Sequence, residues 1–180
     1  MTQHTHQSFF SSPRLNIRPG LRRNAVAIIA LCLTFTATSA HATPEAKMLS
    51  TTIQKIEKMN NATAFEIEAD EYQGRRVYEI ETLQGGEFYE SYIDPETAQI
   101  LTDEQESTPL WTPLDDEEKQ TLAAVKIPLW QAIETIAAEQ NASIQSASFM
   151  TEGGKSYFEF TLADGARYTV DANAGNVAKR

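Results

Sequence analysis

The sequence predicts an α+β fold made of two repeats of one unit, each a helix packed on a three- to four-stranded antiparallel meander sheet. Three observations lead to this prediction. Many positions agree when the chain is shifted by 80 residues. Each half opens with apolar residues at helical spacing, and each continues with alternating segments separated by glycine turns.

The repeat is visible as a series of matches in a constant order. A shift of 80 residues pairs Ile53 with Ile133, Ile56 with Ile136, Asn61 with Asn141, Gly74 with Gly154 and Glu79 with Glu159. Further along, a shift of 77 pairs Asp94 with Asp171 and Ile100 with Val177. The smaller shift indicates that the hairpin after Glu79 is about three residues longer in the first copy, and insertions of this kind belong in loops.

A helix is predicted at the start of each copy. In the first copy the apolar residues recur every three or four positions and so share one face: Leu49, Ile53, Ile56 and Met59. In the second copy Pro128 suits the first helical position, because its missing N–H would be unpaired there. The stripe that follows is Trp130, Ile133, Ile136 and Ala137. We interpret Trp130 as a core residue rather than a ligand-binding one. Asn-Ala closes both helices.

Strands follow each helix. Residues 64–70 alternate between apolar and acidic side chains, which is typical of a sheet with one solvated face. Turns are predicted at Gly74, at Gly85-Gly86 and at Gly153-Gly154. Asp164-Gly165 predicts a type I′ hairpin. Each copy then ends with an aspartate, a small turn and a short apolar strand, so that the helix covers the apolar face of a meander.

A connecting segment joins the two copies. Residues 106–125 are predicted to form a linker with a short helix, between a first unit at 43–105 and a second unit at 126–180. Asp115 followed by Glu118 is the pattern of a helix start. Leu122 and Val125 give this helix an apolar side, so we expect the segment to lie against a domain.

The first 42 residues have the three parts of a secretory signal peptide. A basic leader without acidic residues precedes an apolar run of about 13 residues from Ala25 to Ala37, and Ala40-His41-Ala42 follows. Spanning a bilayer needs roughly 20 apolar residues. We therefore expect cleavage after Ala42 rather than a membrane anchor. The prediction is a periplasmic or secreted protein with no stable membrane insertion after cleavage.

Removal of this leader would change the chemistry that remains. Four arginines and none of the 25 acidic residues would be lost, so the net charge would fall from −10 to −14. A chain this acidic is repelled by nucleic acid, which argues against a nucleic-acid partner. All three histidines and the single cysteine lie at positions 4, 6, 41 and 32 and would also be removed. The usual nucleophile–base pairs and mixed nitrogen–sulfur metal sites are then unavailable.

The motifs of the second unit resemble the PepSY domain family. They are Lys126–Ile133, which carries an Ala-Ile pair, Tyr157–Phe160, which carries a Y-x-E strand, and Tyr168–Val177, which carries V-D-A-x-x-G-x-V. The first unit is a partial match over Val77–Ile80 and Ile93–Ile100, with Ala98 where the family prefers glycine. The resemblance implies a helix-plus-sheet fold, export and no catalytic residues. It also implies, more weakly, a role in holding peptidases inactive.

Carboxylates are the remaining candidates for chemistry. Glu66, Glu68 and Asp70 share one strand face, where a hard cation could bind, but a solvated face needs no ligand and is the interpretation we favour. Two-carboxylate hydrolysis stays open, although nothing in the sequence selects a pair from 25 acids. We therefore predict no enzyme activity, no catalytic residue, no metal site and no cofactor.

Three aromatic residues are the predicted partner-binding candidates: Tyr89, Tyr92 and Trp111. The alternative for all three is that they pack between the two units. The first functional hypothesis is an exported binding or regulatory module that modulates or inhibits another exported protein such as a peptidase. The second is a structural or scaffolding protein of the envelope without a peptidase connection. An enzyme that uses carboxylates alone is the third.

Overall fold

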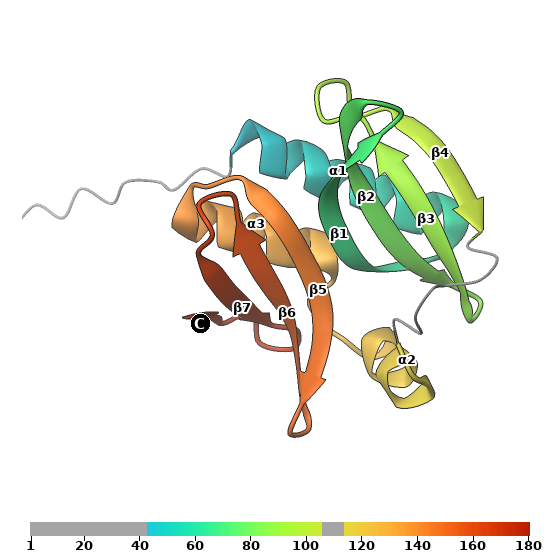
Figure 1. Cartoon of the computed structure of the whole chain (residues 1–180). Helices are drawn as coiled ribbons and strands as arrows, with labels where there is room; N and C mark the ends of the chain where they lie inside the picture. The colour runs from blue at the N-terminus through green and yellow to red at the C-terminus, as the bar shows by residue number, and fades with distance from the viewer. Residues whose placement is uncertain (1–42, 106–113) are drawn as a thin grey trace, which may run out of the picture. The chain divides into compact units, whose positions relative to one another are not determined.

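The computed structural model describes residues 43–105 and 114–180 and confirms the α+β class (Figure 1). The predicted signal peptide, Trp111 and most of the predicted linker lie outside the described residues. The elements in chain order are α1 (Pro44–Asn60), β1 (Thr63–Tyr72), β2 (Arg75–Gln84), β3 (Glu87–Ile93), β4 (Ile100–Gln105), α2 (Asp116–Ala123), α3 (Leu129–Gln140), β5 (Ile144–Glu152), β6 (Lys155–Leu162), β7 (Arg167–Asp171) and β8 (Val177–Lys179). Below, α1 with β1–β4 is the first unit and α3 with β5–β8 is the second.

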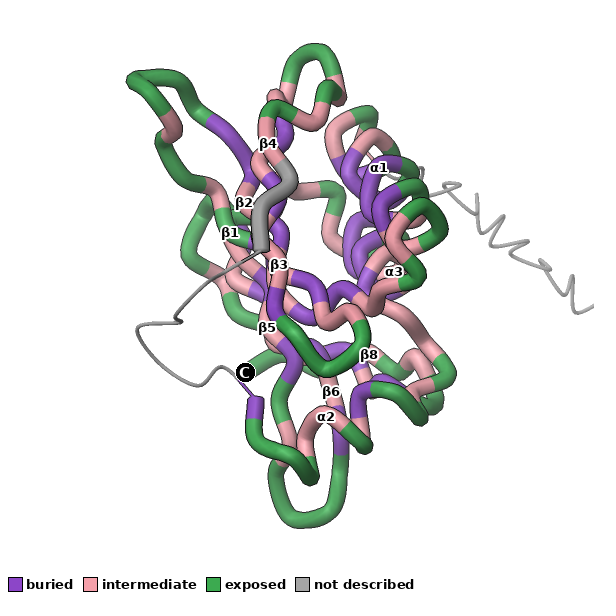
Figure 2. The backbone as a smooth tube through the Cα atoms, turned by 90° about the vertical axis from the view of Figure 1, so that its right-hand side faces the viewer, coloured by how far each residue is buried: buried purple, intermediate pink, exposed green. Residues whose placement is uncertain are grey.

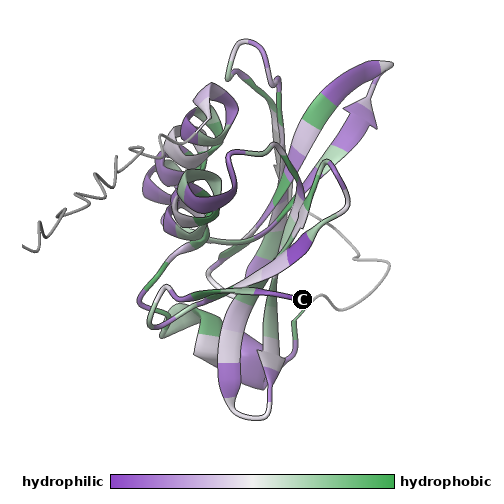
Figure 3. Ribbon diagram, turned by 90° about the vertical axis from the view of Figure 1, so that its left-hand side faces the viewer, coloured by the Kyte–Doolittle hydropathy of each residue, from purple (hydrophilic) through white to green (hydrophobic). Residues whose placement is uncertain are grey.

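All eight described strands form one antiparallel sheet in the order β4-β3-β2-β1-β5-β6-β7-β8. Each unit is a meander, and the two meanders join where β1 pairs with β5. In that pairing Ile67 lies opposite Ala147 and Glu68 lies opposite Ser146. Helices α1 and α3 pack against each other on the same face of this sheet (Figures 1 and 3). The sequence predicted the two meanders but not their union in a single sheet.

One hydrophobic core serves both units. Its fully buried side chains include Ile53 on α1 and Ile133 on α3, and it continues through Ile67 on β1 and Phe158 on β6. Buried backbone concentrates where the helices meet the sheet, while the hairpin tips are exposed (Figure 2). The stripes predicted for the two helices therefore face a common interior rather than two separate ones.

Polar contacts also cross between the units. The hydroxyl of the fully buried Tyr78 on β2 lies 2.5 Å from Glu45 Oε1 and 3.1 Å from the carbonyl oxygen of Ile144 on β5. On the helices, the buried Ser50 hydroxyl donates to Glu134 Oε1 over 2.9 Å. Because an orphaned buried polar group costs free energy, these bonds fix the relative position of the units as well as filling space.

The helix ends largely follow the predicted pattern. Asn61 and Asn141 close α1 and α3 in the left-handed conformation, with φ of 49° and 48°. Two details of the helices were predicted wrongly. Pro128 is the residue before α3 rather than its first helical residue. Met59 is 65% exposed, and the buried side of α1 ends at Ile56.

The face of α3 that packs on the sheet also differs slightly from the predicted stripe. Leu129 and Ala132 are fully buried beside Ile133, whereas Trp130 is half-buried at the edge of the core. A residue one position away from a buried leucine is turned by about 100° around the helix axis, so it reaches only the margin. Trp130 still packs against the core, as predicted.

The closing turns of the two units have the same hydrogen bonds. Asp94 Oδ1 accepts from the N–H groups two and three residues later, and Asp171 Oδ1 does the same. The turn ends in the left-handed region at Ala98, with φ of 59°, and at Gly175, with φ of 73°. Ala98 thus adopts the conformation that glycine favours, at a conformational cost of about 1 kcal/mol.

The hairpin between β6 and β7 corrects the prediction of a type I′ turn. A type I′ turn needs positive φ at both central residues, but of this pair only Gly165 has it, with φ of 82°. The Leu162 N–H donates to the Ala166 carbonyl, and the Gly165 N–H donates to the Leu162 carbonyl. The connection is therefore a three-residue loop that ends in a left-handed glycine.

The connecting helix α2 begins as predicted. Asp115 Oδ1 accepts from the N–H groups of Glu117 and Glu118, and Glu118 Oε2 accepts from the Asp115 N–H. Leu122 is buried in the common core, and Lys119 Nζ lies 4.7 Å from the centre of the Phe88 ring. The helix thus lies against the domain. Across the part of the chain that the structure describes, no helix is long and apolar enough to cross a bilayer.

Candidate functional site

Helices α1 and α3 cover one face of the sheet (Figure 3), and alternate residues of β1, β2 and β3, many of them charged, form the opposite face. Strand residues alternate in direction, so the positions between the buried Ile67, Ile80 and Ile93 point to this side. We call the following group the carboxylate–tyrosine face: Glu68, Asp70, Tyr72, Glu79, Glu90 and Tyr92. Neither α1 nor α3 covers it (Figures 1 and 3).

Strand register brings these side chains together. Glu79 on β2 lies directly opposite Glu68 on β1 and directly opposite Tyr92 on β3. Glu68 and Asp70 are exposed, whereas Glu79 and Glu90 are half-buried. Like charges in directly opposite positions destabilise a sheet. The three strands therefore hold an unfavourable concentration of negative charge in their middle.

The environment of Glu79 shows this concentration most clearly. Burial is the largest of the causes that together raise the pKa of its carboxyl group from 4.5 to about 7, and the negative charges of Glu90, Asp70 and Glu68 are the next largest. A side-chain hydrogen bond with Asp70 acts in the same direction. The five largest influences on this pKa all raise it. Near neutral pH, about half of the Glu79 carboxyl groups carry a proton.

Two tyrosines border the acidic group. The rings of Tyr72 and Tyr92 stack with their centroids 4.6 Å apart and their planes inclined by 17°. Burial raises the pKa of the Tyr92 hydroxyl, and so do its hydrogen bond with Glu90 and the charges of Glu79, Glu90 and Asp70. The stacked pair is thus a flat aromatic surface beside a dense negative charge.

Glu66 lies at the margin of the face, on the seam between the units. The Ser148 hydroxyl of β5 donates to Glu66 Oε1 over 2.9 Å. Burial raises the pKa of the Glu66 carboxyl group, while the bond from Ser148 opposes this increase. Since Glu66 is hydrogen-bonded across the seam, its role is mainly to join β1 and β5.

The second unit treats the same sheet positions differently. Glu159 on β6 forms an ion pair with Arg167 on β7, and its Oε2 lies 3.4 Å from Arg180 Nε. The Arg180 guanidinium also stacks 5.0 Å from the centre of the Tyr157 ring. Among the described residues, the ion pairs of the sheet face lie on this unit and not on the carboxylate–tyrosine face. Its charges are therefore compensated within the protein.

Of the predicted partner-binding residues, one lies on this face. Tyr92 is part of it, and its stacking partner is Tyr72 of the same unit, so Tyr92 does not pack between the units. Tyr89 lies three positions away on β3, which places it on the opposite side of the strand. Trp111 lies outside the described residues. Sequence reasoning missed Glu79, Glu90 and Tyr72; pairing the strands across the turns at Gly74 and Gly85-Gly86 would have found them.

The described carboxylates do not form a metal site. Across residues 43–105 and 114–180, no three aspartate or glutamate side chains are grouped so that they could hold a metal ion. This applies to Glu66, Glu68 and Asp70, which the sequence offered as a cation site. The sequence interpretation of a solvated face agrees with the exposure of Glu68 and Asp70.

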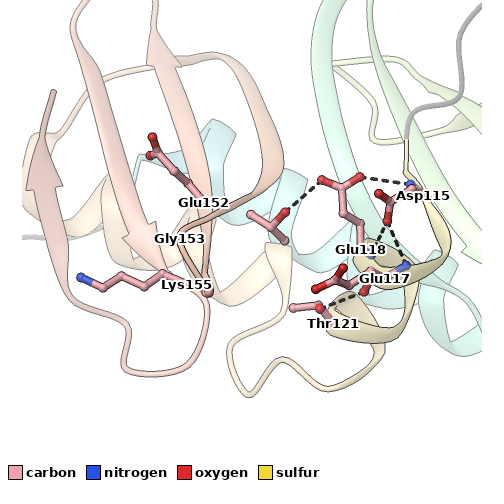
Figure 4. A pocket seen from close by; sticks show the side chains of 9 residues that line it. Asp115, Glu117, Glu118, Thr121, Glu152, Gly153 and Lys155 are labelled. Carbon is pink, nitrogen blue, oxygen red and sulfur yellow. Dashed lines mark hydrogen bonds between the residues drawn. The ribbon is translucent and has the colours of Figure 1, made fainter.

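A hollow of about 370 Å³ lies between the start of α2 and the hairpin that joins β5 to β6 (Figure 4). Its acidic side chains already have structural tasks. Asp115 caps α2, and Glu118 Oε1 accepts from the Thr151 hydroxyl over 3.0 Å. Glu152 and Lys155 point away from α2 (Figure 4). The hollow is therefore a joint between α2 and the sheet, and the carboxylate–tyrosine face is the better candidate for binding.

Comparison with known proteins adds a family to this description. The family model described as "Peptidase propeptide and YPEB domain", named PepSY, matches residues 51–104. Residues 51–104 are a PepSY domain. The match lies on the first unit, which the sequence motifs marked as the partial one, and it includes all of the carboxylate–tyrosine face. The likeness of the second unit rests on its motifs and on the hydrogen bonds that its closing turn shares with the PepSY domain.

Other comparisons add little to this assignment. No protein of curated function matches the chain. A solved structure of a candidate lipoprotein from Clostridium difficile 630 is similar over 71% of this chain and 88% of its own, with 21% sequence identity and a TM-score of 0.38. At that score the similarity carries no argument about function.

Proposed function

We propose that this chain is an exported, non-catalytic binding module that modulates another exported protein, with a peptidase as the first candidate. One observation carries the proposal: the PepSY domain at residues 51–104 bears a sheet face on which Glu68, Asp70, Glu79 and Glu90 lie close together, and none of the ion pairs among the described residues involves these four carboxylates. The described residues contain neither histidine nor cysteine, which fits binding better than nucleophilic catalysis.

We also propose that the two units arose by duplication of one PepSY-like unit. The same element order, the paired left-handed asparagines and the matching aspartate turns support this. Processing after Ala42 fits the fold as well, because the hydroxyl of Thr43 accepts from the Ala46 N–H and so caps α1. Cleavage there would leave the first cap of the folded domain intact, and the mature protein would be periplasmic or secreted.

Two experiments test the proposal. N-terminal sequencing of the exported protein should give Thr43, and an intact Met1 on a membrane-bound species would contradict export by cleavage.

The chain starting at Thr43 should slow a thermolysin-type peptidase acting on casein, or bind it in a pull-down. The matched control is the same chain with Glu79→Gln and Glu90→Gln, which should bind and inhibit less. A chain that has no effect on any exported peptidase would favour the scaffolding alternative.

A further inference from the structure

We propose that the carboxylate–tyrosine face binds a basic segment of the partner protein, with arginine preferred over lysine. This inference deepens the proposed function, because it names the chemistry of the partner that the module would bind. It starts from the part of the sheet face that neither α1 nor α3 covers (Figures 1 and 3). Helix α2 lies beside this part, where Lys119 Nζ is 4.7 Å from the centre of the Phe88 ring.

Charge complementarity is the first argument for a basic partner. The groups that raise the pKa of Glu79 are the carboxylates Glu68 and Asp70 from β1 and Glu90 from β3, and Tyr92 lies opposite Glu79. Arg75 on β2 lies opposite Tyr72, at the edge of this face. A cation placed among them would interact favourably with several carboxylates at once, in a half-buried position where solvent screens less than at an open surface. An acidic partner would be repelled by the same groups.

The cost of this arrangement to the protein is the second argument. Opposed carboxylates such as Glu68 and Glu79 weaken the sheet that holds them. The second unit shows that the same fold can supply its own cations, because Arg167 and Arg180 both reach Glu159. The first unit places Glu90 where the second has Arg167, counted from the matching strand ends. A partner's cation would offset the repulsion that the first unit leaves in place.

The preference for arginine follows from the two tyrosines. A planar guanidinium group stacks on aromatic rings and donates paired hydrogen bonds to a carboxylate, whereas an ammonium group does neither as well. Arg180 shows this geometry inside the protein, where it stacks on Tyr157 and donates to its hydroxyl over 2.6 Å. The Tyr72–Tyr92 pair beside Glu79 and Glu90 offers the same combination to an external arginine.

The test measures binding of a fluorescently labelled oligoarginine peptide to the chain starting at Thr43. Oligolysine should bind more weakly, and oligoglutamate of equal length should not bind. The double variant that carries both Glu79→Gln and Glu90→Gln should bind oligoarginine about tenfold more weakly. The matched control replaces two exposed carboxylates elsewhere, Glu117→Gln and Glu139→Gln, with the same change in net charge and an expected change below about twofold. Equal losses in both variants would overturn the inference.

Proton exchange gives a second, independent readout. Because a bound cation favours the ionised carboxylate, binding near pH 7 should release a proton from Glu79, and affinity should fall as the pH decreases from about 8 to about 6. Calorimetry in two buffers of different ionisation enthalpy measures this release. The release should be absent in Glu79→Gln. Affinity that does not change with pH, or a release that persists in Glu79→Gln, would contradict the inference.

The two levels of proposal can fail separately. The chain could capture an exported partner that oligoarginine does not displace and that the double variant Glu79→Gln, Glu90→Gln binds equally well. That result would overturn the basic-segment inference and leave the binding function standing. Specific oligoarginine binding without any effect on exported proteins would support the chemistry of the face and count against the proposed modulation.

Discussion

The outer faces of the two units differ although their backbones follow the same plan. On the second unit, Glu159 is neutralised by Arg167 and Arg180. On the first unit, Glu79 has carboxylates and a tyrosine around it, and its pKa rises to about 7. The fold therefore does not require a charged outer face of either kind. The negative charges of the first unit support the binding role proposed for this face.

Sheet positions show where the two faces diverge. Glu68 lies opposite Glu79, but Ser148 lies opposite Glu159. Glu90 lies opposite Glu81, but Arg167 lies opposite Thr161. Each change removes a negative charge or adds a positive one on the second unit. The buried side of the same strands is apolar in both units, so packing and surface charge vary independently.

The largest effect should come from the core, where the two units do not differ. Ile53→Ala and Ile133→Ala should each cost about 2–5 kcal/mol of unfolding free energy, because both side chains are fully buried in the common core. Since the core is shared, each variant should still unfold in a single transition in guanidinium, followed by circular dichroism. Two separate transitions, or a neutral Ile133→Ala, would contradict the shared core. Met59→Ala, at an exposed position, is the control and should change stability by less than about 0.5 kcal/mol.

A smaller effect should come from the contact that joins the units. Tyr78→Phe removes the hydroxyl that bonds Glu45 and lies near the Ile144 carbonyl, and should cost about 1–3 kcal/mol. Tyr157→Phe removes an exposed hydroxyl whose hydrogen bonds, to Glu152 and from Arg180, stay within the second unit, and it is the matched control. A loss no greater than that of Tyr157→Phe would show that packing alone holds the units together.

The surface charges should respond in opposite directions on the two units. Glu90→Arg introduces the cation that the second unit already has, and should stabilise the protein by up to about 1 kcal/mol at about pH 8. The pKa of Glu79 is higher in the folded state, so the protonated group favours folding and this contribution is lost as the pH rises through about 7. Below about pH 7 Glu79 is mostly neutral, so the gain in stability from Glu90→Arg should be smaller there. Arg167→Glu should destabilise at both pH values. Thermal melts at two pH values measure both changes, and a destabilising Glu90→Arg would contradict the account of the face.

Local sequence signals predicted much of the fold. Helical spacing located α1 and α3, Asp115 with Glu118 located the start of α2, and the aspartate turns located the ends of both units. The pairing of β1 with β5 was not predictable, because it joins residues about 80 positions apart and neither strand carries a signal for that neighbour. The type I′ prediction at Asp164-Gly165 failed since the dipeptide alone does not determine the loop length.

The candidate site was predictable only in part. Tyr92 was a candidate, but its partner Tyr72 and the acids around Glu79 belong to three different strands. Their proximity depends on the register across two hairpins, which the pattern within a single strand does not indicate. From the sequence alone, Glu79 stood out only as a matching position of the repeat. Its pKa depends on burial by its neighbours, which no single-residue pattern indicates.

The central claim is that the face around Glu79 holds uncompensated negative charge. The most direct test is a carbon-13 NMR titration of the glutamate carboxyl groups in the chain starting at Thr43. Glu79 should titrate at about pH 7, and its pKa should fall toward the ordinary value of 4.5 in Glu90→Arg, which replaces a repelling charge by an attracting one. A Glu79 that titrates near 4.5 in the unmodified protein, or one that does not respond to Glu90→Arg, would contradict the claim.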